Sequence, residues 1–200
     1  MLSSITPLGE RGRRRRWGAT VALYVLGSVA GGGALGAALG GTGTLFVGPL
    51  RPGPAVLSLL VVALCALAAA VDLRLLRGGL PTVGRQVNED WLDRYRGWVI
   101  GLGYGFQLGL GVVTIVTTAT VYLTFALALV AGSWTGGLAV GGAFGLARAL
   151  PLLAMRRAST PERLLRAHRR LQAWARPARL AVPALLSVVA VGVAGLGGLL

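Results

Sequence analysis

Five polar side chains near the middle of the apolar stretch 97–131 are the first candidates for chemistry. They are one glutamine and four threonines: Gln107, Thr114, Thr117, Thr118 and Thr120. Amide and hydroxyl groups can line a path for a small polar solute, or they can satisfy carbonyls freed where a membrane helix is interrupted. A second reading stays open, because threonines and glycines also line tight helix–helix interfaces that need no ligand.

No catalytic constellation accompanies these side chains. The sequence holds no Ser/His/Asp set, no paired intramembrane carboxylates, no Cys/His cluster and no phosphate-binding loop. His168 lacks the second ligand that a metal site needs, and Cys65, the one cysteine, has no partner for an internal disulfide. We therefore expect no enzymatic activity, no metal site and no cofactor.

The polar side chains lie in a stretch that is too long for one straight membrane crossing. A helix of about 34 residues measures roughly 50 Å, whereas the hydrocarbon core of a bilayer is about 30 Å thick. Glycines fill the first half of the stretch and threonines the second. Glycine weakens a helix, and many transporters build their sites at such interruptions. The sequence therefore predicts a third membrane span that is broken or kinked near its middle.

The whole chain has the composition of an all-α integral membrane protein, with 54% hydrophobic and 13% charged residues. Five apolar runs predict five transmembrane helices that form a single transmembrane domain, 17–200, after a basic cytosolic tail, 1–16. The predicted spans are about 17–40, 54–76, 98–131, 134–155 and 180–200. Glycines and prolines over 41–53 predict a loop. The first run could instead be a cleaved signal sequence, an alternative that the residues leave open.

Arginine accounts for all 20 basic residues, and the net charge is +14. The arginines gather between apolar runs, and no groove-reading element accompanies them, so we expect binding to anionic lipid headgroups rather than to nucleic acid. The predicted headgroup contacts are Arg13, Arg14, Arg15, Arg16, Arg163, Arg166, Arg169 and Arg170. The last four belong to an amphipathic helix, about 160–176, that we expect at the cytosolic interface, with Thr160 as one candidate cap.

The distribution of arginine also predicts topology. With five spans and a cytoplasmic N-terminus, Arg51 alone falls outside, in agreement with the positive-inside rule. We therefore expect a multi-pass protein of the plasma (inner) membrane with its C-terminus outside.

Two charged residues lie close to the ends of predicted spans. Asp72 stands two residues before Arg74, which favours an ion pair at the membrane edge over a proton relay. Arg148 lies one to two turns from the end of the fourth span. Its side chain is predicted to extend to the interface, the alternative being a buried functional charge.

Several glycine-rich segments carry a resemblance to a known family. They are the start of the third span, GGAFGLARALPLL at 141–153, ALYVLGSVAGGGALG at 22–36 and LPTVG at 80–84. The chain is similar to the CcdA/DsbD-type membrane proteins of thiol-disulfide exchange and cytochrome c biogenesis, without the family's first helix. The family relays electrons through two intramembrane cysteines, which this sequence lacks, and dithiol exchange needs both thiols.

The resemblance implies a fold with a broken central helix and a role near transport or membrane assembly. The first functional hypothesis is a non-redox relative that moves a small solute across the membrane along the five polar side chains. The alternative is an accessory or scaffold subunit of a membrane complex, or of membrane protein or cytochrome assembly. A third hypothesis is a redox partner that lends only Cys65. The lipid bilayer is the expected environment, and a homodimer and a membrane-protein partner, each packing through glycine faces, stay open.

Overall fold

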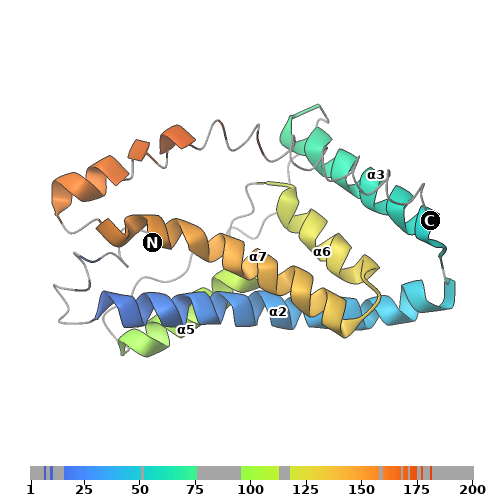
Figure 1. The fold of residues 1–200 in the computed structure, drawn as a ribbon, viewed down its shortest axis with the longest axis horizontal. Helices are drawn as coiled ribbons and strands as arrows, with labels where there is room; N and C mark the ends of the chain where they lie inside the picture. The colour runs from blue at the N-terminus through green and yellow to red at the C-terminus, as the bar shows by residue number, and fades with distance from the viewer. Residues whose placement is uncertain are drawn as a thin grey trace.

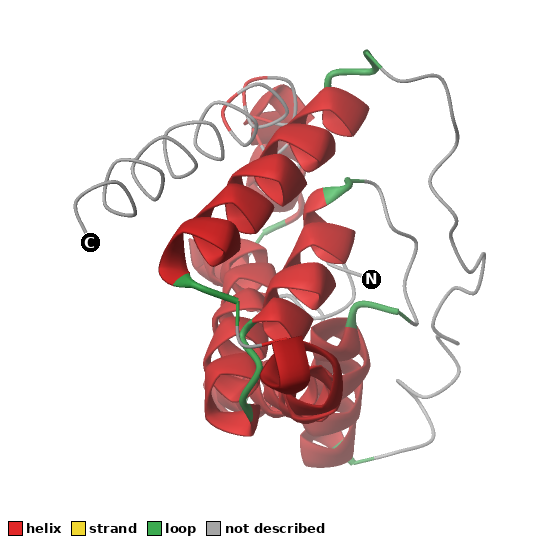
Figure 2. Cartoon of the chain, turned by 90° about the vertical axis from the view of Figure 1, so that its right-hand side faces the viewer, coloured by secondary structure: helices red, strands yellow, loops and turns green. Residues whose placement is uncertain are grey.

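The computed structural model describes residues 16–50, 52–75, 96–112, 118–157 and 160–167, together with isolated positions near both ends of the chain. The regular elements in these ranges are helices (Figure 1 and Figure 2). They are α2 (Trp17–Leu50), α3 (Pro54–Asp72), α5 (Gly97–Leu110), α6 (Thr120–Val130), α7 (Trp134–Ala154) and the 3-10 turn η1 (Met155–Arg157). The all-α prediction is confirmed for these residues.

Three of the described helices are long and apolar enough to cross a membrane. They are Trp17–Leu50, Pro54–Asp72 and Trp134–Leu153. The predicted count of five spans is not reached within the described residues, because the third run forms two shorter helices and the fifth, 180–200, lies outside them except for Ala181. The count of five therefore stays a prediction.

The helix α2 is the longest described element and differs from its prediction. It has 34 residues, so it is about 51 Å long and exceeds the hydrocarbon core by roughly 20 Å. The loop predicted over 41–53 was wrong for 41–50, which continue the helix. The misleading residues are glycines and Pro49, but Pro49 stands one residue before the helix ends, and Gly43 lies against the backbone of Leu129.

The third apolar run is interrupted, as its length and glycine content predicted. The helix α5 ends at Leu110, and Gly111 follows in the left-handed conformation with φ 72°. The next helix, α6, begins at Thr120. Glycine adopts a positive φ at no steric cost, so it is a common residue after the last turn of a helix. Residues 113–117, between these points, lie outside the described ranges.

Short turns connect α6 to α7 and lead into the start of α3. Gly132, with φ 55°, separates α6 from α7, and the Ser133 hydroxyl caps α7 by accepting a 3.1 Å hydrogen bond from the Gly136 N–H. The chain enters α3 through Gly53 and Pro54, the latter in the first helical turn where a missing N–H costs nothing.

The core of the bundle is α2 with α5 and α7 packed along it (Figure 1). Gly105 and Gly109 lie against the carbonyls of Tyr24 and Ser28 respectively, which shows that α5 runs parallel to α2. On another face of α2, Gly36 meets Gly137 and Gly32 meets Gly141, so α7 runs antiparallel to it. A Cβ added at these glycines would collide with backbone atoms of the neighbouring helix. Close approach of backbones through small residues is typical of membrane helix packing.

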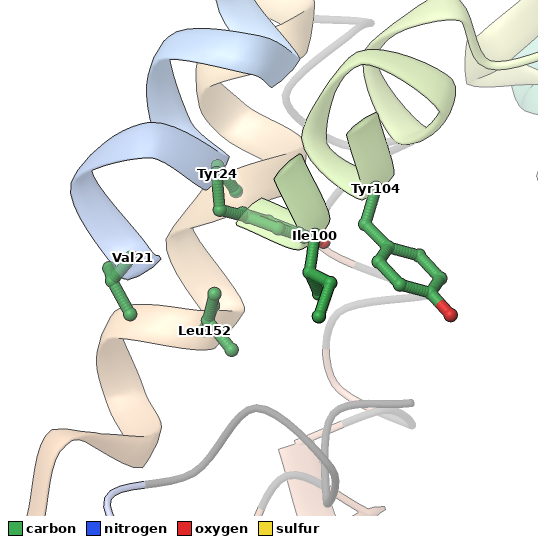
Figure 3. Close-up of a cluster of buried hydrophobic side chains, with 6 residues drawn as sticks. Val21, Tyr24, Ile100, Tyr104 and Leu152 are labelled. Atoms are coloured by element: carbon green, nitrogen blue, oxygen red, sulfur yellow. The ribbon is translucent and has the colours of Figure 1, made fainter. Parts of the chain in front are cut away.

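A cluster of larger side chains fills one end of this core. Val21 and Tyr24 extend from α2 toward Leu152 of α7 and Ile100 of α5 (Figure 3). Tyr104 belongs to the same cluster, and like Ile100 and Leu152 it is at most 1% exposed. The large side chains therefore gather toward the end of the core where α2 and α5 begin and α7 ends.

Residues 161–167 are helical, in the segment predicted as an amphipathic helix. The Thr160 hydroxyl accepts a 3.4 Å hydrogen bond from the Arg163 N–H, as a capping residue does. The position of this helix at a membrane surface stays a prediction, and His168 lies outside the described residues.

Candidate functional site at the break in the third run

Asp72, the last residue of α3, holds the start of α6. Its carboxylate accepts a 2.6 Å hydrogen bond from the Ala119 N–H and a 3.3 Å hydrogen bond from the Thr120 hydroxyl. The first N–H groups of a helix have no partner within the helix and carry partial positive charge, so a carboxylate satisfies and stabilises them.

This arrangement corrects the predicted ion pair between Asp72 and Arg74. The carboxylate is directed to α6, and Arg74 is exposed in a left-handed conformation, φ 58°, just beyond the helix. The sequence places Asp72 and Arg74 two residues apart, but a helix end separates them. The better partner lies 47 positions away along the chain.

An apolar contact between α3 and α6 adjoins the Asp72 hydrogen bonds. Cys65 and Ala68 of α3 pack with Ala119 and Leu123, and Cys65 is 1% exposed. Cys65 and Asp72 are seven residues apart, about two helical turns, so both project on the face of α3 that meets α6. Cys65 is therefore buried among aliphatic side chains.

A groove of about 290 Å³ lies along the same contact. Its lining comes from α3 and α6 together with Ala119, and is almost wholly apolar: Leu64, Leu67, Ala68, Val71, Ala119, Tyr122, Leu123 and Ala126. Such a groove suits an acyl chain or an apolar helix better than a polar solute.

The five predicted path residues do not form one described cluster. Thr120 bonds to Asp72, Thr118 is half-buried beside it, and Gln107 is half-buried on α5. Thr114 and Thr117 lie outside the described residues. Sequence reasoning left Asp72 out of the site, although it is the one acid adjoining an apolar run, and that isolation was the signal that could have found it.

Arg148 of α7 is half-buried, with part of its guanidinium group turned into the bundle. Its Nη1 atom is enclosed by protein, and its Cζ atom lies 5.5 Å from the centre of the Phe144 ring. It also interacts electrostatically with Tyr24 of α2. Phe144 in turn meets Phe125 of α6 edge to face at 6.3 Å. The guanidinium is therefore partly buried against the bundle, and its extension to the membrane interface stays a prediction.

Some of the arginines predicted to contact lipid headgroups lie among the described residues and some do not. Arg13, Arg14 and Arg15 lie outside the described residues. The others are exposed to solvent or headgroups: Arg16, Arg163, Arg166, Arg169 and Arg170. The N-terminal tail is not wholly separate from the bundle, because Glu10 is fully buried and accepts a 2.7 Å hydrogen bond from the Thr20 hydroxyl.

Where α2, α5, α6 and α7 meet, the interior is filled. The Ser28 hydroxyl donates a 2.7 Å hydrogen bond to the Gly145 carbonyl, which ties α2 to α7. The space beside it is too small to hold a water molecule. Its lining includes Gly32, Gly109, Thr124 and Phe144.

The helical fold, the apolar spans and the broken run define a polytopic membrane protein. Residues 3–193 match the family described as cytochrome C biogenesis protein transmembrane region. The chain belongs to this family, which confirms the resemblance seen in its glycine-rich segments.

The curated relatives that match the chain are methylamine utilization proteins. The chain is 34% identical over 156 residues to the methylamine utilization protein MauF of Methylophilus methylotrophus, covering 76% of this chain and 53% of that protein. It is 37% identical over 155 residues to MauF of Paracoccus denitrificans, covering 75% and 55% respectively. The chain thus spans about half the length of these curated relatives. No solved structure matches it significantly.

Proposed function

We propose that this chain is an accessory or scaffold subunit in the plasma membrane that supports assembly of a redox protein system. The family's name refers to cytochrome c biogenesis, which is an assembly process, and the relatives' name refers to methylamine utilization; neither names solute transport, which supports an accessory role better than a transporter. From the relatives' names, we take methylamine utilization as the process in which this chain acts.

The packing at the helix crossing is the observation that carries this proposal. Glycine backbones of α2, α5 and α7 touch directly, and the interior beside Ser28 leaves no space for water. A core of this kind suits a rigid platform, because backbones in contact cannot part without separating whole helices. The 200 residues hold one cysteine, so they supply no cysteine pair for the family's dithiol exchange.

A surface for a partner helix is available on the outside of the core. A groove of about 410 Å³ runs between α2 and α7, and its small lining residues include Ala30, Gly33, Ala139, Gly142 and Ala143. A Cβ added at Gly142 would meet only Val29, at an ordinary 3.8 Å, so a side chain there fills the groove without disturbing the bundle. Small-residue surfaces let another helix approach closely.

Capture in native lipid discs, followed by mass spectrometry of everything that co-purifies, tests the proposal. We expect a stoichiometric protein partner with the unaltered chain and its loss with Gly142→Leu. Gly41→Leu is the matched control, because a Cβ at Gly41 meets nothing within 4 Å, and it should retain the partner. A homogeneous monomer or homodimer that retains a small molecule would contradict the accessory role and restore transport.

A further inference from the structure

The helix α3 is attached to the rest of the bundle differently from the core helices. Its main described contact is with α6, and its buried side chains are Cys65, Ala68 and Ala69. The first half of α3 contributes no buried residue, and Leu59 there is 69% exposed. The attachment is therefore concentrated in the last two turns, next to Asp72.

The hydrogen bonds of Asp72 close this attachment at one end. The Ala119 N–H and the Thr120 hydroxyl both donate to its carboxylate, at the point where the third run resumes as α6. Hydrogen bonds to a charged acceptor are the stronger kind, and removing the acceptor leaves an N–H in apolar surroundings without its partner. Loss of this acceptor would therefore weaken the contact between α3 and the start of α6.

We propose that Asp72 is a latch that holds α3 against the broken third run, and that releasing it opens the α3–α6 interface. The apolar groove along that interface widens when the latch opens, because its two walls belong to α3 and α6. The apolar contact contains small side chains, Ala68 and Ala119, beside Leu123, and the carboxylate adds the hydrogen bonds that hold it closed at one end.

The reactivity of the Cys65 thiol can be used to detect opening of the latch, and no cysteine has to be introduced or removed. Cys65 is the one cysteine of the chain and lies buried between α3 and α6. The test measures the rate at which a small membrane-permeant maleimide modifies the purified full chain in detergent micelles. Protein unfolded in dodecyl sulfate gives the rate of the fully accessible thiol. We expect Asp72→Ala to react at least about tenfold faster than the unaltered chain, because it loses both hydrogen bonds to the carboxylate and one charge-assisted hydrogen bond alone corresponds to about that factor.

Two further variants locate the effect. Asp72→Asn keeps an oxygen that accepts from the Ala119 N–H, so its rate should fall between those of the unaltered chain and Asp72→Ala. Thr124→Ala is the control, because the Thr124 hydroxyl bonds only within α6, to the Thr120 carbonyl at 2.9 Å. It should react at the unaltered rate.

An Asp72→Ala protein that is folded and reacts no faster than Thr124→Ala would overturn the latch. If Asp72→Ala fails to fold, Thr120→Val decides, because it removes only the 3.3 Å hydrogen bond. We expect Thr120→Val to raise the rate a few-fold and to speed hydrogen exchange at the Ala119 amide; no change in either would also overturn the latch. The measurement needs no partner and no solute, so its outcome is independent of the proposed function.

Discussion

The core of α2, α5 and α7 and the outer pair of α3 and α6 are joined by different physical means. In the core, glycines bring backbones into direct contact, as where Gly36 meets Gly137. In the outer pair, side chains such as Cys65 and Leu123 fill the contact, and the Asp72 carboxylate closes it. Lipid tails are as apolar as leucine, so packing and polar contacts decide which helices associate. The glycine contacts of the core separate only if whole helices move apart, whereas the contact between α3 and α6 can open when the hydrogen bonds of one residue, Asp72, are broken.

The largest expected effect comes from adding one methyl group to the core. In Gly36→Ala the new Cβ would collide with the Gly137 carbonyl and the Gly141 Cα, neither of which can rotate away. We expect a loss of about 3 kcal/mol in the free energy of unfolding, measured by titration with dodecyl sulfate. Gly41→Ala on the same helix meets nothing and should unfold at or above the unaltered concentration. Equal midpoints for the two variants would show that the glycine contacts do not hold the core.

The next largest losses in the free energy of unfolding are expected from truncating one leucine in each region. Leu152→Ala empties a site in the core cluster that is 1% exposed, and should cost about 2 kcal/mol of unfolding free energy in the same titration. Leu123→Ala should cost less, because Leu123 already borders an open groove and the site can relax. A larger loss for Leu123→Ala would reverse the comparison.

A buried hydroxyl in the core contributes a smaller amount. Ser28→Ala removes the hydrogen bond to the Gly145 carbonyl and should lower the free energy of unfolding by about 1 kcal/mol. Thr44→Ala is the matched control, since its hydroxyl bonds an exposed carbonyl of its own helix. The role assigned to Ser28 fails if both variants unfold alike.

The smallest effect concerns the helix at 161–167. Hydrogen bonds from its own backbone N–H and from the Thr160 hydroxyl lower the pKa of the exposed Glu162 carboxyl below its usual 4.5. A lowered folded-state pKa stabilises the helix above the usual value, and that contribution disappears as pH falls through the folded pKa. The protection of amides over 161–167, taken relative to the intrinsic exchange rate at each pH, should therefore fall below pH 4.5 in the unaltered chain. In Glu162→Gln this pH dependence should be absent, and an identical dependence in both proteins would contradict the assignment.

Local features of the sequence predicted much of the fold. Hydrophobic runs located α3 and α7, and the change from glycine to threonine located the break between Leu110 and Thr120. The end of α2 was missed because glycine has two roles that composition cannot separate. Gly43 weakens a helix in water, but in this bundle it lets Leu129 approach, and packing outweighs propensity.

The candidate site was less accessible to sequence reasoning. Thr120 was selected, but its partner Asp72 lies on another helix, and a contact across 48 positions leaves no local pattern. Arg148 was expected near the interface from its distance to the span end. Its partial burial beside Phe144 depends on the placement of α7 within the bundle, which spacing along one helix does not reveal.

Hydrogen exchange of the unaltered chain in detergent micelles, resolved by helix, tests the contrast between the two regions most directly. The account predicts the slowest exchange where α2 and α7 meet through glycines, around Gly36 and Gly141, and faster exchange throughout α3 and the first turn of α6. Exchange in α3 that is as slow as in the glycine-packed part of α2 would contradict it, since α3 would then be as firmly held as the core.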